Sequence, residues 1–447
     1  MNDDGGARVN DDGLGLLGGR PDEHPDDGGQ RYFDDPQRAT PVRHAATANG
    51  PRRAETRRAQ ERQTRARRRR RRGTVFAIVV LLVLGGGVVL GGRALLGAIG
   101  IGIGSGGPAD FSGGGVADVV VKVARGDSTS AIAQTLVADG VVSSVSSFTK
   151  AAGGNAGISS IQPGYYKLRT QISGADAVSR LVGSDSRMGN LVIPEGVQLD
   201  DVTGATGIVT AGILTRIHKA SCVELDGTQT CTSMTDLRSV ASTGSLTALG
   251  IPSWAITAVS AVSAPAKRLE GLVRPGSYDL QPGAPALQQL TQVLTASAAE
   301  LDRLGLSKSA ATGLNPYQVL VTASLVQREA LPADFSKVAR VVYNRLAVAQ
   351  KLEFDSTVNY PLDVQAIATT AGDRATVTPW NTYASPGLPA TPISAPSDAA
   401  LAAAEQPATG AWLYFVTIDK NGTTVFSNTF PEHQAAIAQA QANGVFG

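Results

Sequence analysis

A run of apolar residues in the C-terminal half of the chain predicts a buried helix over residues 319–330, VLVTASLVQREA. Asn315 can cap this helix, the proline after it suits the first helical position, and Gln318 lies three residues past the cap. Pro332 disfavours helical backbone at the residue before it, so the helix should end one or two residues beyond Glu329. Glu329 is therefore predicted to lie in the last turn.

The spacing of apolar residues predicts a small α/β unit over residues 118–188. In chain order the pattern gives a strand, two helices, a second strand and a third helix, over residues 118–124, 130–138, 145–152, 164–168 and 175–182. This is the order of a LysM-like glycan-binding module, although no sharp motif accompanies it. A generic αβ spacer is the alternative interpretation.

The next part of the chain mixes strand and helix signals. Residues 190–196 predict a strand ending in a turn, residues 197–202 the start of a helix, and residues 270–280 another strand and turn. Residues 286–304 carry a long helical pattern. Residues 203–262 are rich in Ser, Thr, Ala and Gly with a weak helical period, and we interpret them as a helical insert.

Beyond Glu329 the pattern predicts a helix, an extended segment, an irregular loop, a helix, a hairpin and a last helix, over residues 334–350, 351–360, 379–392, 398–406, 412–429 and 432–443. The hairpin has a strong turn signal in Asn421-Gly422. The loop carries Trp380, Asn381 and Tyr383, and such side chains suit sugars, which offer apolar ring faces and hydroxyls. A rigid surface turn is the alternative. The predicted fold class is α+β.

Residues 74–92 are an uncharged run of about nineteen residues, the length that a bilayer core requires. Residues 52–72 hold 12 arginines on its N-terminal flank, which predicts a single-pass transmembrane helix with a cytoplasmic N-terminus. We expect residues 1–73 to be a disordered cytoplasmic tail with an Arg-rich end, and residues 93–117 a Gly-rich linker. A cleaved signal peptide is the alternative, and the long preceding tail disfavours it.

Charge and cysteine content change the picture in two ways. The net charge of +2 divides into +5 before residue 74 and −3 after it, so the basic balance belongs to the tail, whose task is topology and contact with anionic lipid rather than nucleic-acid binding. Cys222 and Cys231 lie nine apart on the exported side, which favours a disulfide. His218 and His433 are the only histidines there, which disfavours a metal site or a histidine-assisted nucleophile.

Glu329 is the candidate for chemistry. The negative end of a helix dipole and an apolar neighbourhood both disfavour an ionised carboxylate, so its proton should be held to higher pH. A general acid needs that property. The alternative is a solvated surface glutamate.

The ordered segments TASLVQREA, KVARVVYNRL, LEFDSTVNY, WNTY, GLPATPI and WLYFV resemble those of the YceG-like endolytic murein transglycosylases, the MltG family. The resemblance covers roughly residues 118–447. It implies a LysM-like module at residues 118–188 and a mixed α+β catalytic domain at residues 189–447, with the insert at about 203–262. The tail and the cysteine-containing insert lie outside the family pattern.

The resemblance implies cleavage between N-acetylmuramic acid and N-acetylglucosamine inside nascent glycan strands, leaving 1,6-anhydromuramyl ends and ending strand elongation. It implies no cofactor, and as partners it implies glycan strands and cell-wall synthases at the membrane. The family's catalytic glutamate falls on Glu329. The other matching cleft positions are Asn344, Asp355, Thr357, Asn381, Thr382, Tyr383, Gly387, Leu388 and Pro389. Gln327 stands where relatives often have Glu, and Ser356 replaces a frequent proline, a change expected to be harmless.

Two other functions stay open at this stage. If Asp355 faced Glu329 at nucleophile or water-activating distance, a lysozyme-like hydrolase would be the better interpretation. A membrane-tethered peptidoglycan-binding scaffold that cleaves nothing is the alternative from another class.

Overall fold

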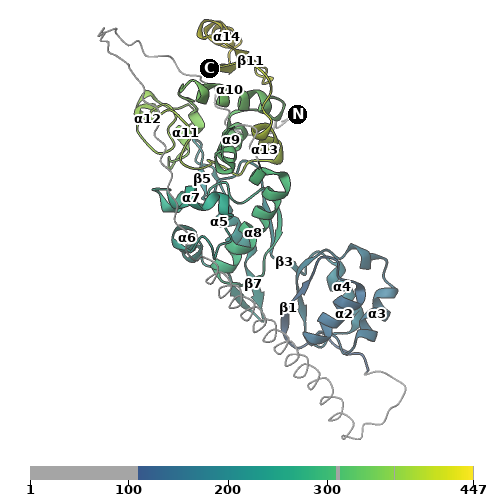
Figure 1. Cartoon of the computed structure of the whole chain (residues 1–447). Helices are drawn as coiled ribbons and strands as arrows, with labels where there is room; N and C mark the ends of the chain where they lie inside the picture. Colours follow the sequence, from purple (N-terminus) through teal and green to yellow (C-terminus); the bar gives the residue numbers. More distant parts are fainter. Residues whose placement is uncertain (1–108, 309–312, 367, 446–447) are drawn as a thin grey trace, which may run out of the picture. The chain divides into compact units, whose positions relative to one another are not determined.

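The computed structural model describes residues 109–308, 313–366 and 368–445 (Figure 1). The tail and the transmembrane helix expected at residues 74–92 lie outside these residues. Within the described part of the chain, no helix combines the length and the apolar character needed to cross a bilayer. Helices and short antiparallel strands make up the described residues, which confirms the α+β class.

Residues 118–188 form a three-stranded antiparallel sheet with β2 in the centre. The elements are β1 (Asp118–Val123), α2 (Thr129–Ala138), α3 (Val145–Gly153), the 3₁₀ turn η1 (Ala156–Ser160), β2 (Gly164–Arg169), α4 (Gly174–Val182) and β3 (Arg187–Met188). Two of the three helices, α2 and α4, pack against the sheet, and α3 packs against both of them. Serine hydroxyls at 128, 144 and 173 cap the three helices. Val121, Leu136, Phe148 and Leu168 belong to a hydrophobic core of this unit's own. The order of strands and helices follows the prediction, and the glycan-binding assignment stays a prediction.

The insert is bracketed by β4 (Asn190–Ile193) and β9 (Gly276–Asp279), which pair antiparallel. Between them lie β5 (Val202–Thr203), β6 (Val209–Thr210), α5 (Ile213–Ala220), β7 (Val223–Leu225), β8 (Thr228–Thr230), α6 (Met234–Thr243), α7 (Ser253–Ser260) and η2 (Pro265–Lys267). The helical insert is therefore confirmed only in part, because β5 pairs with β6 and β7 with β8 as two short hairpins.

The helix expected at residues 197–202 is wrong. The backbone N–H of Gly196 donates to the carbonyl of Ala395 (2.8 Å), and that of Ala395 donates to the carbonyl of Val197 (2.8 Å). The N–H of Leu199 is bound by the Glu270 carboxyl group. Because these backbone groups are satisfied by distant segments, the local helical pattern is overridden.

The central helix of the larger part is α9 (Pro316–Glu329), in which ten of fourteen residues are buried. A helix that is apolar all round belongs in a core, and α9 packs against α10 (Phe335–Ala347), α13 (Asp398–Glu405) and neighbouring turns. The long helix α8 (Ala286–Leu304) has the predicted bounds and shares the largest hydrophobic cluster with α9 and the insert. The chain therefore places the end of its most buried helix, and Glu329 with it, in the interior.

The remaining elements are η3 (Leu306–Lys308), η4 (Pro332–Asp334), α11 (Asp355–Asn359), α12 (Ala371–Ala375), β10 (Tyr414–Thr417), β11 (Thr424–Ser427) and α14 (Phe430–Ala442). The predicted hairpin is confirmed as the β10–β11 pair, and residues 379–392 form no helix or strand, as expected. The extended segment expected at residues 351–360 is wrong in its second half, because Asp355 opens the short helix α11.

Cys222 and Cys231 form a disulfide that closes the β7–β8 hairpin. Nδ1 of His218 lies 2.7 Å from the carbonyl oxygen of Thr232, so the histidine packs beside the bridge. The two sulfur atoms are bonded to each other and are therefore not thiolate ligands for a metal.

Replacing Cys222 and Cys231 together by Ser should lower the free energy of unfolding by roughly 2 to 3 kcal/mol, because the bridge removes loop-closure entropy from the unfolded chain. Urea denaturation of the variant beside the oxidised wild type measures the difference. Wild type in reducing buffer should match the variant, and equal stability of all three would contradict the expectation.

Candidate active site

Glu329 lies in the last turn of α9, as predicted, and is its last residue, so the helix ends slightly earlier than expected. The start of the helix is fixed by a capping box in which the Asn315 side chain accepts from the Gln318 N–H (2.9 Å) and the Gln318 side chain accepts from the Asn315 N–H (3.0 Å). Extended backbone at Ala330 ends the helix. Only 6% of the Glu329 side chain is exposed, so its carboxyl group is largely removed from water.

Ser356, in the first turn of α11, holds the Glu329 carboxyl group. Its hydroxyl donates to Oε1 of Glu329. Its backbone N–H also favours the ionised form of the same carboxyl group. Thr357, the next residue, donates to the Phe354 carbonyl (2.6 Å) and lies 2.9 Å from the Thr382 hydroxyl. The turn that presents Ser356 is thus itself held by buried hydroxyl groups.

Burial raises the pKa of the Glu329 carboxyl group from its ordinary 4.5 to about 7. The negative charge of Asp355 acts in the same direction, whereas the Ser356 hydrogen bonds and the Arg328 charge favour the carboxylate and oppose the shift. The direction predicted from the sequence is confirmed, with burial as its largest cause. A carboxyl group with this pKa can both give and take a proton near neutral pH.

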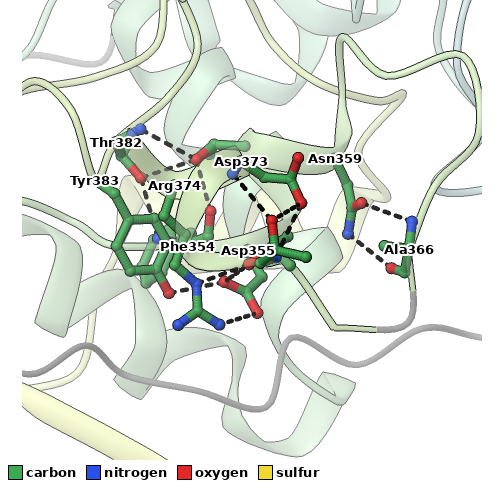
Figure 2. A network of polar contacts seen from close by, with 11 residues as sticks. Phe354, Asp355, Asn359, Ala366, Asp373, Arg374, Thr382 and Tyr383 are labelled. Atoms are coloured by element: carbon green, nitrogen blue, oxygen red, sulfur yellow. Dashed lines mark hydrogen bonds and ion pairs between the residues drawn. The ribbon is translucent and has the colours of Figure 1, made fainter. Parts of the chain in front are cut away.

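Asp355 is buried next to this site and both of its oxygens accept hydrogen bonds (Figure 2). Oδ1 accepts from the hydroxyls of Tyr383 (2.7 Å) and Thr369 (2.8 Å), and Oδ2 lies 3.4 Å from the Arg374 guanidinium. Arg374 also donates to Thr369 (2.8 Å) and stacks over the Tyr383 ring. The carboxylate is therefore engaged with protein donors.

Asn381 shapes the loop that presents Tyr383. Its side-chain amide donates to the carbonyls of Asp373 (3.2 Å), Arg374 (2.9 Å) and Thr376 (2.6 Å). Its Oδ1 accepts from the backbone N–H of Tyr383 (2.8 Å). Asn381 consequently positions other groups, and its own polar atoms are occupied.

Six of the predicted residues are brought together by these contacts: Glu329, Asp355, Thr357, Asn381, Thr382 and Tyr383. Asn344 is instead used to hold the C-terminal segment, since it donates to the carbonyls of Gly410 (3.2 Å) and Trp412 (2.8 Å). Gly387, Leu388 and Pro389 line a cavity of about 520 Å³ beside the start of α9, and the residues lining it do not include Glu329.

Ser356, Thr369 and Arg374 were missed as site residues by the sequence interpretation. Ser356 was judged a harmless replacement, yet it is the direct partner of Glu329. Thr369 and Arg374 lie in a stretch without a hydrophobic period, and they reach Asp355 from 14 and 19 residues away. One sequence signal could have located Arg374. Thr370 and Asp373 form a capping box that starts α12 (Ala371–Ala375), and Arg374 lies on this helix.

A second buried carboxyl group, Glu270, lies outside this site. It is fully buried, both its oxygens accept from the Leu199 N–H (3.1 Å each), and Oε2 accepts from the Tyr360 hydroxyl (2.9 Å). Burial raises its pKa to about 7. Tyr360 in turn packs edge-on against Trp380, so Glu270 ties the end of the insert to the loop before Asn381.

We predict that the stability of the protein falls as pH rises from about 4.5 to about 7. A raised folded-state pKa means that the folded chain binds the Glu270 proton more tightly than the unfolded chain does, so the stabilisation is complete below 4.5 and lost above 7. Between about pH 5 and about pH 8, the free energy of unfolding of Glu270→Gln should rise by about 3 kcal/mol relative to that of wild type. Urea denaturation at both pH values tests this, and parallel changes in the two proteins would contradict it.

The family comparison decides where the chain belongs. A model of the YceG-like family matches residues 121–439, which is most of the chain. The chain belongs to the YceG-like family. The match covers Glu329 and all the other predicted cleft residues of this YceG-like chain.

Two known proteins are similar in sequence to this YceG-like protein. An endolytic murein transglycosylase of Bacillus subtilis (strain 168) is 30% identical over 169 residues, which are 38% of this chain and 47% of that protein. The chain thus spans about half the length of this curated relative. A crystal structure of a YceG-like protein from Listeria monocytogenes is 25% identical, with a TM-score of 0.42 over 71% of this chain and 98% of that chain.

Proposed function

We propose that this YceG-like protein is an endolytic peptidoglycan lytic transglycosylase. It would cleave MurNAc–GlcNAc bonds within nascent glycan strands, leave 1,6-anhydro-MurNAc ends and so terminate glycan elongation. The observation that carries the proposal is the buried carboxyl group of Glu329, whose pKa of about 7 suits both proton donation and proton acceptance. The name of the Bacillus subtilis relative supports the same activity.

The chemistry needs only one carboxyl group. Glu329 gives its proton to the glycosidic oxygen as the bond from that oxygen to C1 of MurNAc breaks, and the departing GlcNAc keeps the proton. The resulting carboxylate takes the proton from the 6-hydroxyl of the same MurNAc as O6 forms its bond to C1. Attack within one sugar replaces attack by water, which gives an effective-concentration advantage. The reaction therefore consumes neither a cofactor nor a water molecule.

The contacts of Asp355 favour this reaction over hydrolysis. An ordinary glycosidase needs a second carboxylate that can attack C1 or activate water. Asp355 is the nearby candidate, and its oxygens accept from Tyr383, Thr369 and Arg374. A carboxylate held by three donors is a poor nucleophile and a poor base, which supports Glu329 acting alone.

We further propose the domain order and location given by the sequence. A single transmembrane helix at residues 74–92 would leave the N-terminus in the cytoplasm and place the LysM-like module and the catalytic domain outside, beside glycan strands and cell-wall synthases. The Cys222–Cys231 disulfide supports an exported domain, because disulfides persist in oxidising compartments.

Mass spectrometry of glycan strands incubated with the full-length protein tests the activity. Borohydride reduction before analysis separates the products, since reducing ends are converted and anhydro ends are not. Anhydro-ended internal fragments support the proposal. Reducing ends would indicate a hydrolase, and uncut strands of both nascent and mature type would favour the non-catalytic scaffold.

A further inference from the structure

We propose that the first turn of α11 controls the proton on Glu329, with Ser356 as a positioning residue that holds the carboxyl group and Asp355 as the charge that opposes it. This inference rests on the proposed function, because it assigns a role to the residues around the proposed acid. The two residues are adjacent in the chain, so one helical turn acts on Glu329 in two opposite ways.

Ser356 acts through its hydroxyl, which donates to Oε1 of the Glu329 carboxyl group. Its backbone N–H also favours the ionised form of that group. An oxygen that accepts a hydroxyl proton is a poor place for the acid's own proton, so that proton belongs on Oε2. Ser356 thereby selects Oε2 as the proton donor, and it stabilises the carboxylate formed after the first transfer.

Asp355 acts through its charge. It is buried, and Tyr383, Thr369 and Arg374 fix its two oxygens in place (Figure 2). Its charge acts on the Glu329 carboxyl group from the residue next to Ser356. A negative charge beside a buried carboxyl group disfavours ionisation. Asp355 therefore keeps Glu329 protonated for the first half of the reaction, whereas Ser356 favours the ionised form that the second half needs.

Other charged or titratable groups also interact electrostatically with Glu329. They are Arg328, the preceding residue on α9, Arg345 on α10, and Tyr383 in the loop after Asn381. All three remain in variants of α11. A difference between such variants in the pH at which Glu329 titrates is therefore due to the first turn of α11.

Opposite shifts in two variants test the inference. Ser356→Ala should raise the pH at which Glu329 titrates by about one unit, and Asp355→Asn should lower it by a similar amount. Ser356→Thr keeps the hydroxyl and should restore the wild-type value. Ser356→Pro fits the first turn of a helix and removes both the hydroxyl and the backbone N–H, so its shift should exceed that of Ser356→Ala. Ser239→Ala, at an exposed position on α6, is the matched control.

Two readouts separate this inference from the proposed function. The first is the alkaline limb of the pH profile of kcat/KM on glycan strands. The second is the titration of the Glu329 carboxyl carbon by ¹³C NMR in the full-length protein, assigned with Glu329→Gln, which requires no activity. If one variant does not fold, the remaining variants still test the inference.

If wild type cuts strands but all variants titrate alike, the inference fails and the proposed function stands. If the variants shift in opposite directions while wild type cuts nothing, the proposed function fails and the control of Glu329 by α11 stands. Opposite shifts in both readouts support the two together. Shifts of the same sign for Ser356→Ala and Asp355→Asn would overturn the inference.

Discussion

Glu329→Gln should reduce the rate of glycan cleavage by on the order of 10²- to 10⁴-fold, the range that a positioned acid–base group contributes. The variant keeps the size of the side chain and loses only the proton that we propose Glu329 gives and takes back. Because the folded protein holds this carboxyl group with a raised pKa, the neutral amide should not destabilise the fold near pH 7. Initial rates on isolated glycan strands measure the effect.

Glu300→Gln is the matched control, since Glu300 lies on the partly exposed surface of α8 and pairs with Arg303 one turn away. It should cut strands at the wild-type rate. Cleavage by Glu329→Gln at more than about a tenth of the wild-type rate would contradict the assignment of the acid.

Arg345→Leu should lower the free energy of unfolding by about 3 to 5 kcal/mol, as the removal of one partner from a buried charge pair does. The Arg345 side chain is 2% exposed. It donates to the carbonyls of Leu413 (2.6 Å), Leu352 (2.5 Å) and Lys351 (3.3 Å), and Glu353 lies 3.9 Å away. Leucine would leave these carbonyls buried without their donor. Urea denaturation at neutral pH measures the loss.

Arg345→Lys should recover only part of this stability, because an ammonium group lacks the fork of donors that reaches three carbonyls. Arg303→Leu removes a mostly exposed arginine and should change stability little. Similar losses for Arg345→Leu and Arg303→Leu would show that the buried network does not hold α10 to the segments after it.

The helices whose signals are local were predictable from the sequence. The Asn-Pro-Tyr-Gln start of α9 satisfies its own backbone donors, and the proline at 332 forbids continuation, so both ends are set by neighbouring residues. The raised pKa of Glu329 followed from its position at the end of an apolar helix. Local chemistry was therefore sufficient to locate the candidate acid.

The turn that holds the acid was not predictable in the same way. The residues LEFDSTVNY contain β-branched and aromatic side chains, which favour extended backbone. The short helix α11 is held instead by the Thr357 and Thr382 hydroxyls and the Phe354 backbone, and Thr382 lies 25 residues further on. Contacts across that distance leave no periodic trace in the sequence.

Matching a family motif also did not predict how a residue is used. Asn344 lies at a motif position, and the structure uses it to tie α10 to the carbonyls of Gly410 and Trp412. Arg374 lies outside the family segments that the sequence resembles, and it binds Asp355 directly. The spacing of motif residues indicates which residues belong to one site. The contacts that each residue makes depend on tertiary packing, which local sequence patterns do not encode.

Cleavage of glycan strands in H₂¹⁸O, followed by mass spectrometry of the new ends, tests the central claim most directly. If Glu329 acts alone and the 6-hydroxyl is the nucleophile, wild type will produce anhydro ends that carry no ¹⁸O, and Glu329→Gln will produce none. New ends that contain ¹⁸O would show that water attacks C1 and would contradict the account.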